Sequence, residues 1–164
     1  MSYSIPDICD EFSDRLQVLE PMFTEFGGKK KFSGEIVTIK CFEDNSLVKS
    51  SLGSAGHGKV LVVDGGGSLG CALLGDLLGA MAVKNGWQGV LVNGCVRDVE
   101  ILKDMDLGVR ALNCHPLKSN KHNEGQLNLT VRFAGVVFEP GQYLYADENG
   151  MVVARENLNL NRDG

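Results

Sequence analysis

The chain lacks the features that mark membrane, secreted or nucleic-acid-binding proteins. No stretch approaches the ~18 consecutive apolar residues that cross a bilayer. The first seven residues have neither the basic start nor the apolar run of a signal peptide. Positive charge gathers only at Lys29-Lys30-Lys31 and the net charge is −5, which disfavours direct contact with a nucleic acid backbone. We therefore expect a cytoplasmic protein that binds neither membranes nor nucleic acids.

Cysteine and histidine are present but form no recognisable pattern. The five cysteines are odd in number and contain no CxxC pair, which excludes a disulfide framework and a zinc ribbon. Free thiols at this density favour a reducing compartment. Cys95 lies two residues before Arg97 and is a candidate reactive thiol, but a packed core cysteine is the favoured interpretation. The three histidines, His57, His115 and His122, have no metal-site spacing.

What the chain does contain is the composition of one ordinary globular domain. Its 164 residues are 43% hydrophobic and 23% charged. A domain of this length buries roughly 70% of the surface of its unfolded chain, so a core forms without disulfides. We predict a single domain that spans residues 1–164.

Hydrophobic periodicity predicts an α/β fold with a mixed sheet. Residues 59–64 are a continuous apolar run, typical of a strand buried on both faces, whereas the tail alternates like half-buried hairpin strands. Turns are expected at Asn93-Gly94, Ala134-Gly135 and 148–150. The other expected strands are 35–42, 71–74, 89–92, 109–112, 129–133, 136–138, 143–145 and 151–153; helices are expected at 7–19, 45–49, from Gly75-Asp76 onward, and at 99–103.

Two successive strand-to-helix junctions carry acidic residues, Gly75-Asp76 and Arg97-Asp98. Ligands in open α/β sheets bind beyond the carboxyl ends of parallel strands, near helix N-termini. If these two strands are neighbours, two carboxylates, one guanidinium and free backbone N–H groups converge, which suits an anionic ligand that chelates a hard cation such as Mg²⁺. The alternative is that both aspartates only cap helices and that Arg97 pairs with one of them.

Two other features have plain structural interpretations. Gly65-Gly66-Gly67 follows a strand but matches neither GxGxxG nor GxxxxGK[ST], so a tight turn is favoured over a nucleotide loop. The glycine turn also suggests a methyltransferase, but this function has little support because no acidic residue stands at the spacing expected for binding a ribose. Trp87 is interpreted as a core or interface anchor.

Several segments in order resemble the RraA-like family over residues 5 to 156. They are Glu20-Pro-Met-Phe23, Phe26-Gly-Gly28, Ile39-Lys-Cys-Phe-Glu-Asp-Asn45, Val60-Leu-Val-Val-Asp-Gly-Gly-Gly-Ser68, Gly94-Cys-Val-Arg-Asp98 and Tyr145-Ala-Asp147. The resemblance implies a compact β/β/α sandwich of the RraA-like swivelling-domain type, assembled as a homotrimer or as a hexamer. One branch of the family is named for regulation of ribonuclease E. The other contains class II aldolases that split 4-hydroxy-4-methyl-2-oxoglutarate into two pyruvates, often with oxaloacetate decarboxylase activity.

The aldolase branch implies specific roles for residues of this chain. Its pattern, an aspartate, twenty residues and then Arg-Asp, is matched by Asp76 and Arg97-Asp98. By resemblance, Gly75, Asp76, Leu77 and Leu78 receive the substrate carboxylate, Arg97 binds the 2-oxo acid, and Asp98 holds a divalent cation, Mg²⁺ or Mn²⁺. Arg97 and Asp76 are the expected catalytic residues, and Asp76 is expected to transfer the proton.

Two departures weaken the match to the aldolase branch. The longer aldolases carry a C-terminal extension with acidic residues for a neighbouring subunit, and this chain ends at Gly164. The segments 20–23 and 41–45 also look closer to the regulators. Retention of an aspartate at position 76 favours a working metal site. The primary expectation is a metal-dependent lyase acting on a small 2-oxo acid, and the alternative is a non-catalytic protein that binds and inhibits ribonuclease E.

Overall fold

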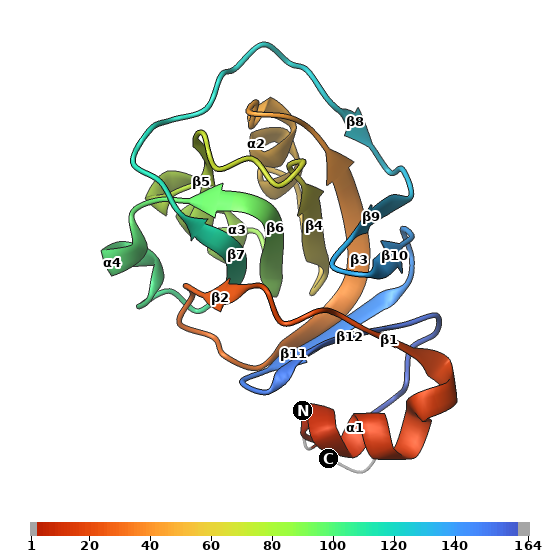
Figure 1. The fold of residues 1–164 in the computed structure, drawn as a ribbon. Helices are drawn as coiled ribbons and strands as arrows, with labels where there is room; N and C mark the ends of the chain where they lie inside the picture. Colours follow the sequence, from red (N-terminus) through yellow and green to blue (C-terminus); the bar gives the residue numbers. More distant parts are fainter. Residues whose placement is uncertain (1–2, 161–164) are drawn as a thin grey trace.

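A computed structural model describes residues 3–160 and contains one large mixed sheet (Figure 1). The strand order is β1-β12-β11-β3-β4-β6-β7-β2, with β5 paired to β6, β8 paired to β3, and a separate β9–β10 hairpin. The strands are β1 (Leu16–Val18), β2 (Thr24–Glu25), β3 (Phe32–Lys40), β4 (Val60–Asp64), β5 (Ala72–Leu74), β6 (Gly89–Val96), β7 (Gly108–Cys114), β8 (Gln126–Leu127), β9 (Val131–Phe133), β10 (Val136–Phe138), β11 (Tyr143–Asp147) and β12 (Gly150–Ala154). The helices are α1 (Ile5–Phe12), α2 (Ser46–Leu52), α3 (Asp76–Lys84) and α4 (Val99–Leu102), with a 3₁₀ turn at Ser13–Arg15.

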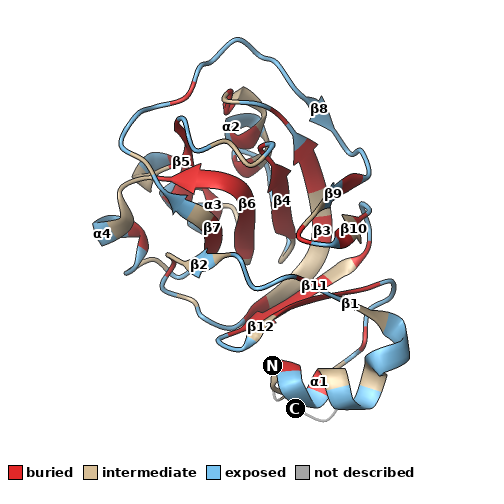
Figure 2. Cartoon of the chain, viewed as in Figure 1, coloured by how far each residue is buried: buried red, intermediate tan, exposed pale blue. Residues whose placement is uncertain are grey.

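The parallel strands β3, β4, β6 and β7 form the centre of the sheet. Every residue of β4 is buried, and its side chains alternate between two cores. Leu61 and Val63 pack in the core beneath the helices, whereas Val60 and Val62 pack on the opposite face. The continuous apolar run thus forms a strand covered on both sides, as expected (Figure 2).

Helices α2, α3 and α4 cover one face of the central strands. Val48 and Leu52 of α2 and Leu78 and Ala82 of α3 point into this core. Trp87 lies in the same core at 5% exposure, and its indole N–H donates to the Ser54 carbonyl at 3.0 Å. The interpretation of this tryptophan as a core anchor is confirmed.

The opposite face is covered by the β9–β10 hairpin and the curl of β11 and β12, which completes a β/β/α sandwich. Ala134 and Gly135 both have positive φ, 52° and 72°, the backbone of a tight two-residue hairpin turn. Phe138 is fully buried, and its ring stacks on Phe133 at 4.5 Å between centroids. Helix α1 packs separately against β11 and β12. The predicted α/β fold with a mixed sheet is confirmed.

Two local predictions were wrong. The expected helix over 7–19 ends at Phe12, and Leu16–Val18 instead pairs antiparallel with β12, because ladder bonds at a free sheet edge outweigh helical periodicity. Asn93-Gly94 does not turn the chain but continues β6, where the Asn93 amide donates to Asp64 Oδ1 at 3.1 Å. Within residues 3–160 no helix is long and apolar enough to cross a membrane. The prediction of one domain over 1–164 includes residues 1–2 and 161–164, which lie outside the described residues.

Candidate functional site

The two acidic strand-to-helix junctions lie next to each other at the carboxyl edge of the sheet. β5 pairs parallel with β6, with Ala72 opposite Cys95 and Leu74 opposite Val96. Beyond them the Arg97 N–H donates to the Leu74 carbonyl at 2.9 Å, which extends the pairing into the junctions. Helices α3 and α4 therefore start from adjacent points, as the prediction of a shared site requires.

Asp98 joins the two junctions. Its Oδ2 accepts the backbone N–H of Asp76 at 2.9 Å, so it caps α3 and makes no capping hydrogen bond to its own helix α4. Its backbone is left-handed, with φ 58°, a conformation that costs an aspartate roughly 1 kcal/mol or more. The absence of a side chain at Gly75 lets the Asp98 carboxylate lie this close to the start of α3, since a Cβ at position 75 would stand 2.5 Å from Asp98 Oδ2.

All six predicted site residues line one cavity of about 370 Å³. They are Gly75, Asp76, Leu77, Leu78, Arg97 and Asp98. Arg97 is half-buried, and its Nη1 donates to the Pro116 carbonyl at 3.4 Å. It forms an ion pair with neither aspartate, nor with any other carboxylate of residues 3–160. The guanidinium therefore retains donors for an anion, and the alternative in which Arg97 pairs with an aspartate does not occur.

The backbone N–H groups at the start of α3 are only partly available. The Asp76 N–H is bonded to Asp98, and the Leu77 N–H donates to Asp76 Oδ1 at 2.8 Å. Within residues 3–160 the Leu78 N–H has no acceptor, while the Leu78 side chain is buried in the core. The Leu77 side chain is 79% exposed. A ligand carboxylate at this turn thus meets Leu78 N–H directly and reaches Leu77 N–H only if Asp76 turns away.

Five polar residues that were not predicted from the sequence as site residues line the same cavity: Asn45, Lys49, Lys118, Ser119 and Lys121. Lys49 lies on α2, and the other two lysines lie on the segment 115–125, which we call the strap. With Arg97 they bring four cationic side chains against two carboxylates, so the lining carries a formal charge of +2. The signals in sequence were the close spacing of Lys118 and Lys121 and the position of Asn45 before α2, but neither indicates a shared cavity.

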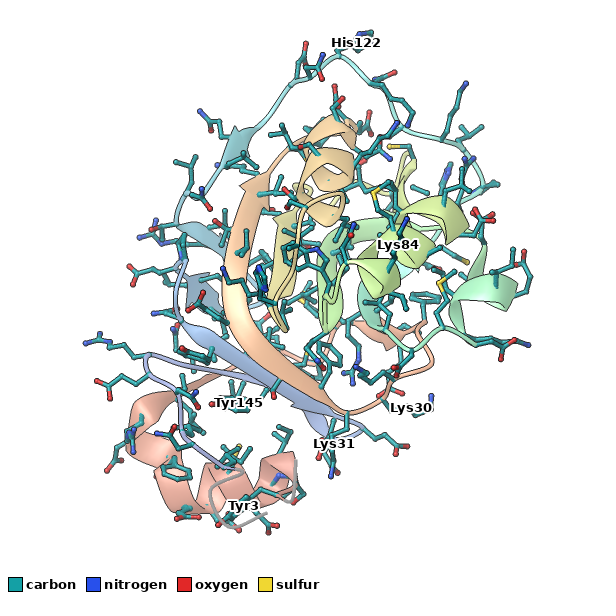
Figure 3. All side chains as sticks on the ribbon, turned by 180° about the vertical axis from the view of Figure 1, so that it is seen from behind. Tyr3, Lys30, Lys31, Lys84, His122 and Tyr145 are labelled. Carbon is teal, nitrogen blue, oxygen red and sulfur yellow. The ribbon has the colours of Figure 1, made fainter. Side chains whose placement is uncertain are left out.

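The strap is fastened at its far end by Asp44. His122 and Glu124 donate backbone N–H bonds to Asp44 Oδ2 at 2.7 and 3.4 Å, and Ser46 donates to Oδ1 at 2.9 Å. Burial acts to raise the pKa of this carboxyl, but the hydrogen bonds from Ser46, His122 and Glu124 outweigh it and lower the pKa to about 2. Figure 3 shows His122 on the outer arc of the strap. Asp44 is therefore ionised near neutral pH and holds the strap against α2.

The two aspartates at the cavity fit an open cation site. Mg²⁺ is commonly held by one or two carboxylates, with water and ligand oxygens completing its shell. Residues 3–160 contain no group of three or more His, Cys, Asp and Glu side chains arranged to hold a metal ion, so a closed protein cage does not fit. Asp76 and Asp98 are thus the candidate metal ligands, in a site that a chelating substrate would complete.

The glycine turn after β4 is not shaped to receive a nucleotide. The Gly65 and Gly67 N–H groups donate to the Asn93 carbonyl, each at 3.1 Å, and the Gly66 N–H donates to Asp64 Oδ1 at 3.0 Å. The N–H groups that a phosphate loop would present are consumed by the turn itself. This confirms the interpretation of a tight turn.

Cys95 is 1% exposed, and burial, followed by the nearby Cys114 thiol, raises its pKa. It is a packed thiol rather than a reactive one.

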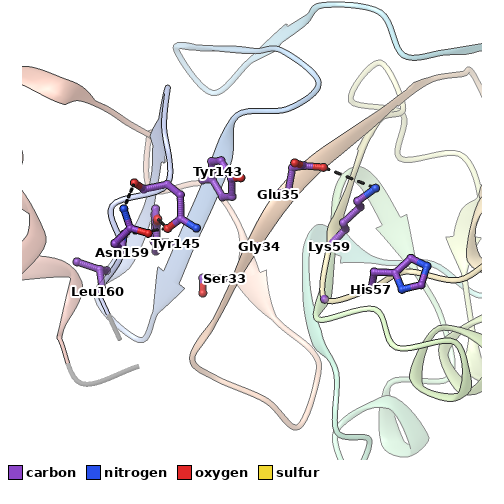
Figure 4. A pocket seen from close by; sticks show the side chains of 11 residues that line it. Ser33, Gly34, Glu35, His57, Lys59, Tyr143, Tyr145, Asn159 and Leu160 are labelled. Atoms are coloured by element: carbon purple, nitrogen blue, oxygen red, sulfur yellow. Dashed lines mark hydrogen bonds and ion pairs between the residues drawn. The ribbon is translucent and has the colours of Figure 1, made fainter. Parts of the chain in front are cut away.

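A second cavity, of about 580 Å³, lies at the junction of β3 and β11 (Figure 4). Its Lys59 Nζ lies 3.6 Å from Glu35 Oε2, and the neutral Tyr145 hydroxyl accepts the Leu158 N–H at 2.8 Å. The cavity at the α3 and α4 junctions concentrates uncompensated charge and is the better candidate.

Fold and site together define an α/β protein with a pocket at the carboxyl edge of its sheet that is lined by four cationic side chains and two carboxylates. Comparison with known proteins identifies the family. The model of the RraA-like family, described as Aldolase/RraA, matches residues 5–153, and the chain belongs to this family.

Its relatives come from both branches. A protein of Pseudomonas fluorescens Pf0-1, named "Putative 4-hydroxy-4-methyl-2-oxoglutarate aldolase", is 58% identical over 96% of this chain and 97% of its own length. An Azotobacter vinelandii protein of the same name is 57% identical over 98% and 99%. Such relatives support the prediction of a carbon–carbon lyase.

Two solved structures superpose closely, each with a TM-score of 0.94. One is the RNA-processing inhibitor RraA from Thermus thermophilis, 40% identical, covering 100% of this chain and 99% of that one. The other is a Geobacillus kaustophilus HTA426 protein named S-adenosylmethionine: 2-dimethylmenaquinone methyltransferase, 46% identical, covering 99% of this chain and 100% of that one.

Proposed function

We propose that this protein is a divalent-metal-dependent lyase that releases pyruvate from 4-hydroxy-4-methyl-2-oxoglutarate and, as a side activity, decarboxylates oxaloacetate. The observation that carries the proposal is the convergence of Arg97, Asp76 and Asp98 on one cavity, with the arginine paired to no carboxylate of residues 3–160. Curated relatives near 57% identity, which this chain matches almost end to end, carry the corresponding aldolase name.

Both reactions pose one chemical problem, since cleavage of the carbon–carbon bond leaves negative charge on a pyruvate enolate. Arg97 places a fixed positive charge beside the 2-oxo group, where this charge develops. The Leu78 N–H and the positive end of α3 receive the adjacent carboxylate. Asp76, which lines the cavity, transfers the proton to or from the leaving fragment.

Asp98, assisted by Asp76, would hold Mg²⁺ or Mn²⁺. The cation, when bound, acts as a Lewis acid on the oxygens of the 2-oxo acid, a contribution of several kcal/mol in comparable sites. Asp98 also keeps the α3 N-terminus in place through its bond to the Asp76 N–H. Its loss should therefore affect both the cation and the turn that receives the carboxylate.

The test is pyruvate release from oxaloacetate and from 4-hydroxy-4-methyl-2-oxoglutarate with Mg²⁺ or Mn²⁺, with EDTA as the metal-free control. Asp98→Asn preserves shape and tolerates the left-handed backbone, so we expect a folded protein whose kcat/KM falls at least a hundredfold. Asp98→Ala should abolish turnover as well. Asp106→Asn, at an acid whose side chain is 85% exposed, serves as the matched control. Turnover unchanged in Asp98→Asn, or insensitive to EDTA, would refute the assignment.

A second candidate function is inhibition of ribonuclease E, favoured by the full-length likeness to the RNA-processing inhibitor RraA. The net charge of −5 suits docking to a basic partner segment, which charge would steer. Immobilised protein incubated with purified ribonuclease E tests this directly. Retention that disappears at high salt supports docking, and a wild type that binds without any lyase turnover would make regulation the primary role.

We further infer that the protein assembles as a trimer, or as a hexamer of two trimers. Large apolar side chains stand exposed beside the cavity, Leu77 at 79% and Leu117 at 62%. Exposed apolar groups next to a functional site are typical of subunit contacts. Sedimentation of the native chain and of Leu77→Asp measures the assembly, and a monomeric wild type would contradict the inference.

A further inference from the structure

The lysines of the candidate site come from elements that the proposed chemistry does not use. Arg97 and the α3 turn account for one carboxylate and the 2-oxo group of a substrate. Lys49 projects from α2, while Lys118 and Lys121 project from the strap into the same cavity. Lys118 is placed by the pairing of its backbone with Ala72, whose N–H donates to the Leu117 carbonyl at 2.8 Å.

These three cations are not neutralised by the protein. No ion pair joins Lys49, Lys118 or Lys121 to a carboxylate of residues 3–160, whereas Lys29, Lys30 and Lys59 each have an acidic partner within 4.0 Å. Several like charges around one hollow raise the local concentration of anions and favour a ligand that carries more than one negative charge.

The side chain of Lys121 is held in place by a hydrogen bond. Its Nζ donates to Asn45 Oδ1 at 2.9 Å, and the Asn45 amide donates in turn to the Leu73 carbonyl at 3.3 Å. Asn45 is 9% exposed, so a buried amide fixes the ammonium at the cavity wall. The neighbouring Asp44 holds the strap from the other side through His122 and Glu124.

We propose that Lys121 and Lys118, supported by Lys49, form the subsite for the second carboxylate of a dianionic 2-oxo acid and so determine the substrate class. This inference rests on the proposed function, in which the Leu78 N–H binds the first carboxylate and Arg97 lies beside the 2-oxo group. A 2-oxo acid with one carboxylate leaves the lysines unsatisfied, whereas a 2-oxo diacid has a second carboxylate for them. Asn45 acts as a positioning residue for Lys121.

The experiment compares a dianion with a monoanion in the same protein. Lys118→Gln/Lys121→Gln removes two charges with little change in size, and Lys84→Gln is the control, at an exposed lysine on α3 outside the cavity lining. We expect kcat/KM for oxaloacetate to fall at least tenfold in the double variant, mainly through KM. Deuterium exchange into the pyruvate methyl group, followed by NMR, should change less than twofold. Equal losses for oxaloacetate and pyruvate, or no loss for either, would overturn the proposal.

Equilibrium binding separates this inference from the proposed lyase activity. Titration of wild-type protein with 2-oxoglutarate and with 2-oxobutyrate, monitored calorimetrically, requires no turnover. The diacid should bind at least tenfold more tightly, and the double variant should remove that preference. Absence of turnover with this preference intact would refute the lyase but keep the subsite, and equal affinity for the two acids in the wild type would refute the subsite.

Asn45→Ala examines the positioning role. Loss of the amide should raise KM for oxaloacetate while leaving kcat within about twofold, because Lys121 keeps its charge but not its place. Asn45→Asp should not restore the KM, because its carboxylate would pair with the Lys121 ammonium and cannot donate to the Leu73 carbonyl. A fall in kcat alone, or a KM restored by aspartate, would exclude this role.

Discussion

Replacing Asp44 with asparagine tests how the strap is held on the body of the protein. The Asp44 carboxylate is 1% exposed and accepts backbone N–H bonds from Ser46, His122 and Glu124. These bonds form best with the ionised carboxylate, which is why the pKa falls from 3.8 to about 2 against the opposing effect of burial. Asparagine keeps one acceptor oxygen but turns an NH₂ group toward N–H donors.

The pKa shift sets the size of the effect. A fall of nearly two pKa units at about 1.4 kcal/mol each corresponds to about 2 kcal/mol of folding free energy. Because the folded-state pKa lies below the unfolded value, this stabilisation is fully present above about pH 4. It is lost as the pH falls from about 4 through about 2. We therefore expect Asp44→Asn to lower the free energy of unfolding by about 2 kcal/mol at pH 7 and by roughly half as much at pH 3.

Urea unfolding at pH 7, 4 and 3, with wild type and variant side by side, measures this difference. Asp106→Asn is the control, since that exposed acid should change stability by less than ~0.5 kcal/mol. Hydrogen exchange gives a local readout, because the His122 and Glu124 amides should lose protection in the variant. A loss below ~0.5 kcal/mol at pH 7, or a loss of the same size at all three pH values, would refute the reasoning.

Two further predictions concern the site and the thiols. Gly75→Ala brings a Cβ within 2.5 Å of Asp98 Oδ2, so the carboxylate must rotate away from the Asp76 N–H. Urea unfolding should show that the free energy of unfolding falls by about 1–2 kcal/mol, and the rate of pyruvate release should fall by a larger factor. Unchanged turnover would contradict the geometry described for this junction. Cys114 is exposed, whereas burial and then neighbouring carboxylates raise the pKa of Cys41 to about 12, so iodoacetamide at pH 8 should modify Cys114 first and Cys41 last, as read by peptide mass spectrometry. Early modification of Cys41 would show that the burial argument is wrong.

Helices, strands and turns that depend on interactions between residues close in the sequence could be predicted from the sequence alone. The run from Val60 to Asp64 is apolar at every position but the last, so it had to form a strand covered on both faces. Ala134-Gly135 between two short β-prone segments predicted a hairpin, and Gly75-Asp76 predicted the start of a helix. The acidic junctions at 75–76 and 97–98 were recognisable as a candidate site because parallel strands place their carboxyl ends at one edge.

Features that depend on partners distant in the chain emerged only in the folded molecule. Leu16–Val18 became a strand because β12, more than a hundred residues later, offered a free edge. Asp98 caps the helix of the other junction instead of its own, which no local capping rule predicts. Lys49 and the strap lysines reach one cavity because Asp44 and Asn45 bind a segment about eighty residues away. Periodicity carries information about a residue's own helix or strand, whereas the charge of a cavity depends on which elements packing brings together.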